Sequence, residues 1–408
     1  MTTSDSAAPV PPLFSPAFVQ NPYPTYHRHL AGPLVQPSAV RAGVNLIFQY
    51  QACATLMRDS RLSSASRVPA FFPVDHAERL AVADLERHLR RWLLVQDPPV
   101  HSRRRKAMNA GFTPAVMERL RPRVEAVVDR LLSKLARTEA PDLIRDLAYP
   151  LPVQVISDLL GVPRALQDRC VTLSNDLATW MGDPLRTTEA ARRAQVAVLE
   201  LVEIIASTIA ARESGADDDL MALLLGMTRE DASLTTEELH AQCVMLLFAG
   251  HETTRNLIGN GLYTLLRHPA ALADVRADDA AVRGAVEEVL RYESPVQGYS
   301  RGVAEDIRYE DWTLPAGTSV AFVIGAAQRD PRQISDPDRF DIHRPHNRHL
   351  AFGGDAHTCL GSTLARLEGQ LAIRETVRRF PALRLVDERP DWSPTFGFRG
   401  LRTLSVTL

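Results

Sequence analysis

Apolar residues recur at helical spacing along most of the chain, and only short segments have the pattern of a strand. β-Branched and aromatic residues cluster or alternate over residues 44–50, 319–324 and 401–408. Elsewhere, and above all in the central two-thirds, apolar positions three and four residues apart predict helices. The pattern therefore predicts a mainly α-helical fold with a small β region.

The clearest predicted helix begins after Thr235. Thr235 and Glu238 have the spacing of a capping box, and Pro269 ends a helical pattern that continues to His268. Such a helix has about 33 residues and is about 50 Å long. Residues 244–248 are apolar on every side, so we expect this helix to run through the core.

One cysteine lies between a glycine-rich turn and another predicted helix. Leucines recur at helical spacing from Leu360 onward, which places Cys359 at a helix N-terminus, where the dipole and free N–H groups favour a thiolate. Gly353, Gly354 and Gly361 would let the backbone approach a flat cofactor closely. A thiolate placed there can bind iron; the alternative is that Cys359 is an inert buried thiol.

Inside the long helix, an acid and an alcohol stand next to each other. Glu252 and Thr253 closely follow the small pair Ala249 and Gly250, and a Thr hydroxyl can donate to a carbonyl one turn earlier. One interpretation is a local kink or a water-filled groove where oxygen binds. The other is a capping or solvated Glu–Thr pair.

Two further pairs have the spacing of neighbours on one helix face. Glu288 and Arg291 are three residues apart, and His101 and Arg105 are four apart. Taken alone, the Glu288–Arg291 pair also fits a solvated surface pair.

Read in chain order, these motifs resemble those of the cytochrome P-450 family, the heme-thiolate monooxygenases. The family's H-x-x-x-R, A-G-x-[DE]-T, E-x-x-R and F-G-x-G-x-H-x-C-x-G patterns begin here at His101, Ala249, Glu288 and Phe352. The resemblance covers residues 17–408 as a single domain, after a tail over residues 1–16 that we expect to be disordered. It implies the family's helical fold, with heme b between the long helix and the cysteine loop.

The resemblance also implies roles for individual residues. Cys359 is the expected iron ligand, and Glu252 and Thr253 are the expected catalytic residues, which deliver protons during oxygen activation. The residues expected to hold heme are His101, Arg105, Ala249, Arg301, Phe352, His357, Cys359 and Gly361.

A structural role is implied for the E-x-x-R motif. Glu288 and Arg291 are expected to form a buried pair that is joined by an arginine of the later meander. We expect that arginine to be Arg339, with Arg344 as the alternative.

The cysteine loop departs from the family pattern at one position. Asp355 stands where the family has its second glycine. Asp is among the few residues that tolerate a positive φ, so we expect the turn to survive. The extra negative charge near the thiolate is expected to lower the iron potential.

Composition and charge exclude several classes of protein. The net charge of −2 argues against a nucleic-acid binder, and the four cysteines, scattered without C-x-x-C pairs, argue against zinc sites and a secreted disulfide framework. The longest apolar run near the middle is far too short for a membrane span, and the N-terminus lacks the features of a signal peptide. We therefore expect a cytoplasmic monomer that is not anchored to a membrane.

Electrons are expected to come from separate proteins. No flavin or iron–sulfur segment follows Leu408, so the resemblance implies transfer from NAD(P)H through a reductase and a ferredoxin. Arg103, Arg104 and Lys106 form a basic cluster that is expected to dock the acidic ferredoxin, with a merely solvated charge run as the alternative.

The expected reaction is hydroxylation or epoxidation of a small apolar organic molecule in secondary metabolism. Oxidative radical coupling on the same heme and a non-catalytic recruitment module are the alternatives. Apolar and aromatic side chains are expected to line the substrate pocket, although an aromatic stripe is more often plain core. The expected pocket residues are Phe71, Phe72, Val244, Phe248, Val296, Gln297, Phe396 and Phe398.

Overall fold

The computed structural model describes residues 10–72, 75–182, 187–212, 220–229 and 234–408. Its α-helices are α1 (Pro16–Gln20), α2 (Tyr23–Leu30), α3 (Tyr50–Leu56), α4 (His76–Leu80), α5 (Ala83–Leu89), α6 (Val100–Asn109), α7 (Pro114–Leu135), α8 (Pro150–Leu159), α9 (Arg164–Gly182), α10 (Thr188–Ala210), α11 (Leu220–Arg229), α12 (Thr236–Leu266), α13 (Pro269–Ala277), α14 (Asp279–Tyr292), α15 (Ile324–Ala327) and α16 (Ser362–Arg379). Three 3-10 helices, η1 (Val68–Phe71), η2 (Leu93–Val95) and η3 (Ala110–Phe112), and one π-helical turn, η4 (Ile144–Ala148), complete the helical elements. The strands are β1 (Val35–Pro37), β2 (Val44–Ile47), β3 (Leu62–Ser63), β4 (Tyr299–Val303), β5 (Ile307–Tyr309), β6 (Trp312–Leu314), β7 (Ser319–Phe322), β8 (Arg384–Leu385), β9 (Asp391–Trp392), β10 (Leu401–Thr403) and β11 (Val406–Thr407).

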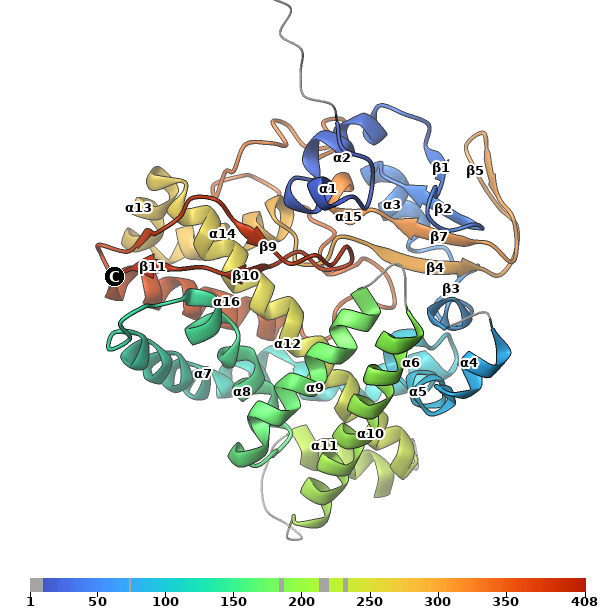
Figure 1. Ribbon diagram of the computed structural model, residues 1–408, viewed down its shortest axis with the longest axis horizontal. Coiled ribbons are helices and arrows are strands. Elements are labelled where there is room, and N and C mark those ends of the chain that lie inside the picture. The colour runs from blue at the N-terminus through green and yellow to red at the C-terminus, as the bar shows by residue number, and fades with distance from the viewer. Residues whose placement is uncertain (1–9, 73–74, 183–186, 213–219, 230–233) are drawn as a thin grey trace, which may run out of the picture.

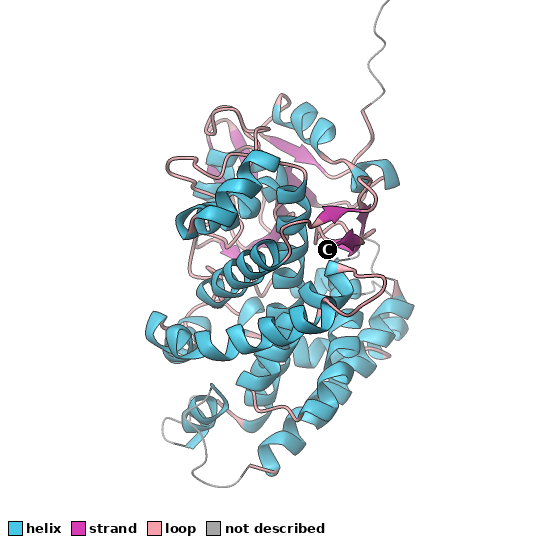
Figure 2. Cartoon of the chain, turned by 90° about the vertical axis from the view of Figure 1, so that its left-hand side faces the viewer, coloured by secondary structure: helices cyan, strands magenta, loops and turns pink. Residues whose placement is uncertain are grey.

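The expected fold class, mainly α with a small β region, is confirmed. Five strands form one sheet in the order β1-β2-β7-β4-β3, in which β2 and β7 are parallel and the other neighbours are antiparallel. Helices α7 to α11 gather on one side of the molecule, and the sheet lies on the other side with α1, α2, α3 and α15 (Figure 1). The view turned by 90° shows the same division between helices and strands (Figure 2). None of the helices in the described ranges is long and apolar enough to cross a membrane.

Helix α12 is the predicted long helix, and it runs through the core. The Thr235 hydroxyl accepts the Glu238 N–H and the Glu238 carboxylate accepts the Thr235 N–H, so the predicted capping box is confirmed. The helix ends at Leu266, two residues before the predicted end, and Pro269 begins α13. Residues 241–248 and 256–265 are buried on every side, yet Ala249 between them is exposed. The helix therefore borders an open space at its middle.

The three predicted strand segments form strands, but with narrower limits. Residues 44–50 give β2 and the start of α3, residues 319–324 give β7 and the start of α15, and residues 401–408 divide into β10 and β11. The sequence analysis missed β4, which pairs with β7 in the centre of the sheet. Its sequence Tyr-Ser-Arg-Gly-Val contains a glycine and an arginine and lacks the apolar alternation of a half-buried strand.

The folded body begins earlier than the expected residue 17. Ser15 caps α1 by accepting the Phe18 N–H, and the Thr25 hydroxyl donates to the Pro11 carbonyl over 2.6 Å. The Phe14 ring packs edge-to-face on Phe396, with 5.2 Å between centroids. Residues 10–16 therefore contact the rest of the fold, and the remainder of the expected tail, residues 1–9, lies outside the described residues.

Candidate functional site

The cysteine loop folds back on itself ahead of α16. Gly353 has a φ of 77°, the left-handed conformation that favours glycine, and the Cys359 N–H donates to the Phe352 carbonyl over 2.8 Å. Burial raises the pKa of the Cys359 thiol, while a hydrogen bond from the Gly361 N–H and the charge of Arg105 lower it in part. Of the four cysteines, all of them described, Cys359 alone is exposed. Cys359 is therefore accessible, although the surrounding protein partly removes water from its thiol.

Asp355 supports this turn by a different device from the one expected. It does not have a positive φ, because among the motif's residues only Gly353 does. Its Oδ1 accepts the His357 N–H over 2.7 Å, and its carbonyl accepts both the N–H and the hydroxyl of Thr358. The turn survives because the Asp side chain caps it, as in an Asx turn. The effect of this charge on an iron potential stays a prediction.

Basic side chains from three elements meet beside the loop. His101 and Arg105 come from α6, Arg301 from β4 and His357 from the loop itself, and the His101 and His357 ring centroids are 4.0 Å apart. Burial lowers the pKa of Arg301 and of Arg105. Burial, with the charges of Arg301 and His101, lowers the pKa of His357 to about 2. The cluster thus joins two arginines with histidines whose lowered pKa values favour the neutral ring.

This basic cluster is short of negative partners. Both ring nitrogens of His101 are buried with no hydrogen-bond partner in the described part of the chain. The carboxylate of Asp355 approaches Arg301 only to 4.0 Å. Buried polar groups are normally satisfied, so these groups call for an anionic ligand with several acceptor oxygens.

These observations fit heme. The two propionates of heme are anions that would satisfy His101, Arg105, Arg301 and His357. Ala249 is an exposed position after a buried length of α12, and Cys359 is an exposed position in a mostly half-buried loop; the resemblance puts the two faces of the ring at these positions. The residues present are therefore those that heme requires.

The acid–alcohol pair on α12 has the predicted backbone bond but not a mutual contact. The Thr253 hydroxyl donates to the Ala249 carbonyl over 2.9 Å, one turn toward the N-terminus. The Glu252 carboxylate accepts from Arg255 over 3.1 Å and from Asn256 over 3.2 Å, toward the C-terminus. The two side chains thus point in opposite directions along the helix.

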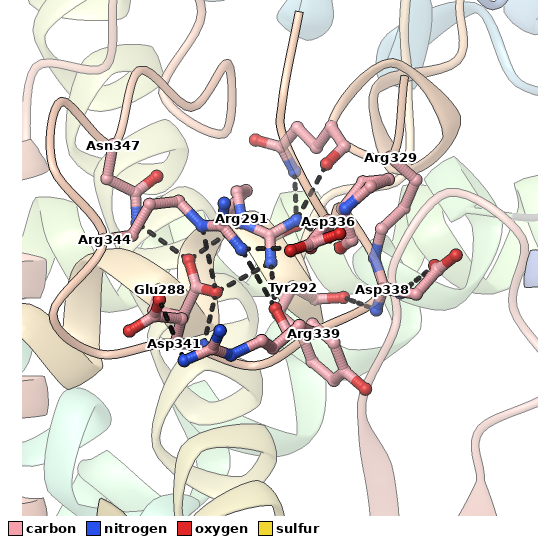
Figure 3. Close-up of polar contacts among 12 residues, drawn as sticks. Glu288, Arg291, Tyr292, Arg329, Asp336, Asp338, Arg339, Asp341, Arg344 and Asn347 are labelled. Carbon is pink, nitrogen blue, oxygen red and sulfur yellow. Dashed lines mark hydrogen bonds and ion pairs between the residues drawn. The ribbon is translucent and has the colours of Figure 1, made fainter. Parts of the chain in front are cut away.

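The E-x-x-R pair is buried, as expected. Arg291 donates to both carboxylate oxygens of Glu288, over 2.8 and 2.7 Å, and the two side chains are 1% and 0% exposed. Arg291 also donates to the carbonyls of Gln328, Pro337 and Arg339, so it joins α14 to the meander (Figure 3).

The third member of this network is Arg344, and the choice of Arg339 is wrong. Arg344 Nε lies 3.4 Å from Glu288 Oε1, whereas the Arg339 side chain is 68% exposed and faces Asp341 at 3.6 Å (Figure 3). Arg339 contributes only its backbone carbonyl, because the chain turns there and directs its side chain outward. The sequence analysis also missed Asn347, whose amide donates to Glu288 over 3.0 Å.

The expected ferredoxin patch loses one of its three members. Arg104 is 4% exposed and forms an ion pair with Glu238 at the start of α12. Arg103 and Lys106 are exposed and, being three residues apart, share a face of α6 that does not include Arg104. Arg104 is therefore a structural residue, a role that the spacing of a short charged run does not reveal.

The expected pocket residues do not form one wall. Phe71 and Phe72 are buried against Trp180, and Phe248 packs on Trp92 with 5.4 Å between centroids. Val244 is fully buried on α12. These side chains belong to the main core.

The remaining pocket residues lie in two places. Val296 and Phe398 pair across an isolated bridge. Gln297 accepts the Tyr26 hydroxyl over 2.6 Å, and Phe396 packs on Phe14, so both face the N-terminal helices. Two other side chains at the loop were missed: Arg366 stacks on Phe352 at 4.5 Å, and Arg58 donates to the Gly354 carbonyl over 2.8 Å.

Comparison with known proteins gives consistent matches. A family model described as cytochrome P450 matches residues 71–398. The cytochrome P450 monooxygenase PikC of Streptomyces venezuelae is 39% identical over 399 residues, which is 95% of this chain and 91% of that protein. Cytochrome P450 107B1 of Saccharopolyspora erythraea is 40% identical over 351 residues, 85% of this chain and 81% of that one. The crystal structure of P450BioI in complex with hexadec-9Z-enoic acid ligated acyl carrier protein has a TM-score of 0.89 and 33% identity, and the match covers 97% of this chain and 100% of that chain.

Proposed function

The chain belongs to the cytochrome P450 family, and we propose that it is a heme-dependent monooxygenase that hydroxylates or epoxidises a small apolar organic molecule in secondary metabolism. The observation that carries this proposal is the exposed Cys359 beside a basic cluster in which both ring nitrogens of buried His101 lack a hydrogen-bond partner among the described residues. The similarity to PikC, whose name describes a monooxygenase, supports the same reaction type.

The residues that would hold heme b come from α6, β4 and the cysteine loop. Cys359 would bind the iron, and His101, Arg105, Arg301 and His357 would bind the propionates. When bound, heme supplies the redox-active iron that activates molecular oxygen.

Proton supply is the proposed work of Glu252 and Thr253. The Glu252 side chain is 12% exposed, so it can exchange protons with solvent, and the Thr253 hydroxyl can pass a proton on because it both donates and accepts. In the present arrangement that hydroxyl is engaged with the Ala249 carbonyl, so it must turn to take part. Ala249 is exposed, so there is open space beside this bond.

The ligand experiment compares two cysteine variants. Cys359→Ala should lose the red-shifted absorption of the reduced carbon monoxide complex that is typical of the family, because no thiolate then reaches the iron. Cys53→Ala, at a buried thiol in α3, should retain it and serves as the control. A normal band in Cys359→Ala with full heme content would contradict the assignment.

Electrons are proposed to come from NAD(P)H through a reductase and a ferredoxin that docks near Arg103 and Lys106. Both are exposed cations on α6, the helix that also carries the proposed propionate ligands His101 and Arg105. The double variant Arg103→Gln/Lys106→Gln should make ferredoxin-dependent reduction slower and less sensitive to salt. Arg389→Gln, which removes an exposed arginine after β8, is the control. If the reduction rate depends on salt equally in the wild type and both variants, Arg103 and Lys106 are not part of the docking site.

A further inference from the structure

The Glu252 carboxylate is held at both oxygens by its own helix. Arg255 Nη1 donates to Oε2 over 3.1 Å, and Asn256 Nδ2 donates to Oε1 over 3.2 Å. Arg255 and Glu252 are 15% and 12% exposed, so solvent screens this pair only in part. Thr253 donates to Ala249 on the preceding turn, so the acid and the alcohol are each engaged away from the other. Before a proton can pass directly between them, the carboxylate must leave Arg255 and Asn256 and take up a proton from solvent.

Arg255 is itself held from two sides. Its guanidinium carbon lies 5.1 Å from the centroid of the Tyr149 ring, a cation–π contact, and its Nη2 donates to the Leu401 carbonyl over 3.3 Å. The Tyr149 hydroxyl accepts a hydrogen bond from Asn175 of α9. Tyr149 therefore provides a fixed aromatic surface on which the arginine rests.

A local irregularity of the backbone places Tyr149 there. The π-helical turn η4 immediately precedes it, and the Tyr149 N–H donates to the Ile144 carbonyl, five residues back, over 2.9 Å. This turn is docked closely on α12, since a Cβ at Gly259 would lie 2.5 Å from Ile144 Cδ1. π-Helical turns are rare and frequently occur at functional sites.

His251 also packs on Tyr149, but its ring carries no charge there. Its ring meets the Tyr149 ring edge-to-face, with 5.0 Å between centroids. Burial, reinforced by Arg255, lowers the pKa of His251 to about 3, so the ring is neutral near pH 7. Arg255 is therefore the cation that faces Glu252.

We propose that Arg255 is a positioning residue that latches the Glu252 carboxylate away from Thr253, and that Tyr149 sets how firmly the latch holds. This inference rests on the proposed role of Glu252 in proton supply. Opening the latch then precedes each transfer, and the ion pair slows it. The arrangement makes Arg255 a regulator of proton supply and leaves substrate binding to other residues.

The main test is a double-mutant cycle in the heme-loaded protein. Arg255→Gln should raise oxygen consumption at saturating substrate and reductant by up to about fivefold, which corresponds to about 1 kcal/mol at 1.36 kcal/mol per tenfold. The spectral dissociation constant of the substrate should not change. Glu252→Gln should lower the rate, and adding Arg255→Gln to Glu252→Gln should have no further effect, because the latch then has nothing to hold.

Tyr149 provides the conservative comparison. Tyr149→Leu removes the ring under Arg255 and should shift the rate in the direction of Arg255→Gln, whereas Tyr149→Phe keeps the ring and should behave like the wild type. Arg145→Gln, which removes an exposed cation of η4 paired with Asp146, is the control for net charge. In the infrared spectrum, the carboxylate band identified by its loss in Glu252→Gln should shift in Arg255→Gln and in Tyr149→Leu only.

The possible failures are distinguishable. If Glu252→Gln leaves the rate unchanged, the proposed proton role of Glu252 is wrong, and the proposal for Arg255 that rests on it is wrong as well. If Glu252→Gln slows the reaction but Arg255→Gln does not raise the rate, or acts equally in both backgrounds, the latch alone is overturned.

Discussion

Gly284 is the position where one added methyl group should do most harm to the network around Glu288. It lies on α14, one turn before Glu288, and a Cβ built on it would be 2.1 Å from the backbone carbonyl oxygen of Ile342. A side chain could rotate away from such a contact, but a backbone carbonyl cannot. The same segment carries the Asp341 N–H that donates to Glu288 over 2.8 Å, so Gly284→Ala must push this donor away from the carboxylate.

The expected change in the free energy of unfolding is the sum of one stabilising and two destabilising contributions. Alanine is favoured over glycine in a helix interior by about 1 kcal/mol. Overpacking typically costs about 1–3 kcal/mol, and a weakened hydrogen bond to a charged acceptor costs about 1.5–3 kcal/mol. We therefore expect Gly284→Ala to lower the free energy of unfolding by about 1.5–5 kcal/mol.

Urea unfolding followed by tryptophan fluorescence, together with heme content per protein, would measure this effect. Gly226→Ala in α11 is the matched control, because a Cβ there meets nothing within 4 Å, and it should raise stability by about 0.5–1 kcal/mol. If Gly284→Ala were as stable as Gly226→Ala, the close approach of the meander to α14 would be refuted.

Three further outcomes are expected. Arg344→Met should lower the free energy of unfolding by about 1–2 kcal/mol, because it removes a donor to buried Glu288, whereas Arg339→Met should change it by less than about 0.5 kcal/mol; equal urea midpoints would contradict the assignment. Thr253→Ala should leave heme content and substrate affinity nearly intact but lower the product formed per NAD(P)H and raise peroxide, and unchanged coupling would argue against the proton role. Burial and Arg255 lower the pKa of His251 to about 3. Between about pH 6.5 and pH 3, the unfolded chain therefore binds a proton that the folded protein excludes. As the pH decreases through this range, this group lowers the free energy of unfolding by about 1.4 kcal/mol per pH unit. His251→Phe should therefore flatten the decrease of the urea midpoint below about pH 6, and an unchanged slope would show that His251 is not buried and neutral.

The sequence by itself determined the features that depend on neighbouring residues. The capping box of Thr235 and Glu238 is a local hydrogen-bond pattern, so its spacing was sufficient to place the start of α12. The bond from Thr253 to Ala249 and the contact between Glu288 and Arg291 also join residues within one helical turn. Motif order along the chain was enough for the family, which the comparisons show.

Only the tertiary structure decided which of several similar side chains reaches a given partner. Arg344 rather than Arg339 meets Glu288 because the path of the meander turns one inward and the other outward. Arg104 is buried and paired with Glu238 at the start of α12, a residue 134 positions away. The position of Arg255, which donates to Glu252, involves Tyr149 and Leu401 from distant segments. Long charged side chains reach many partners from one position, so their pairing is decided by packing between segments, which residue spacing does not record.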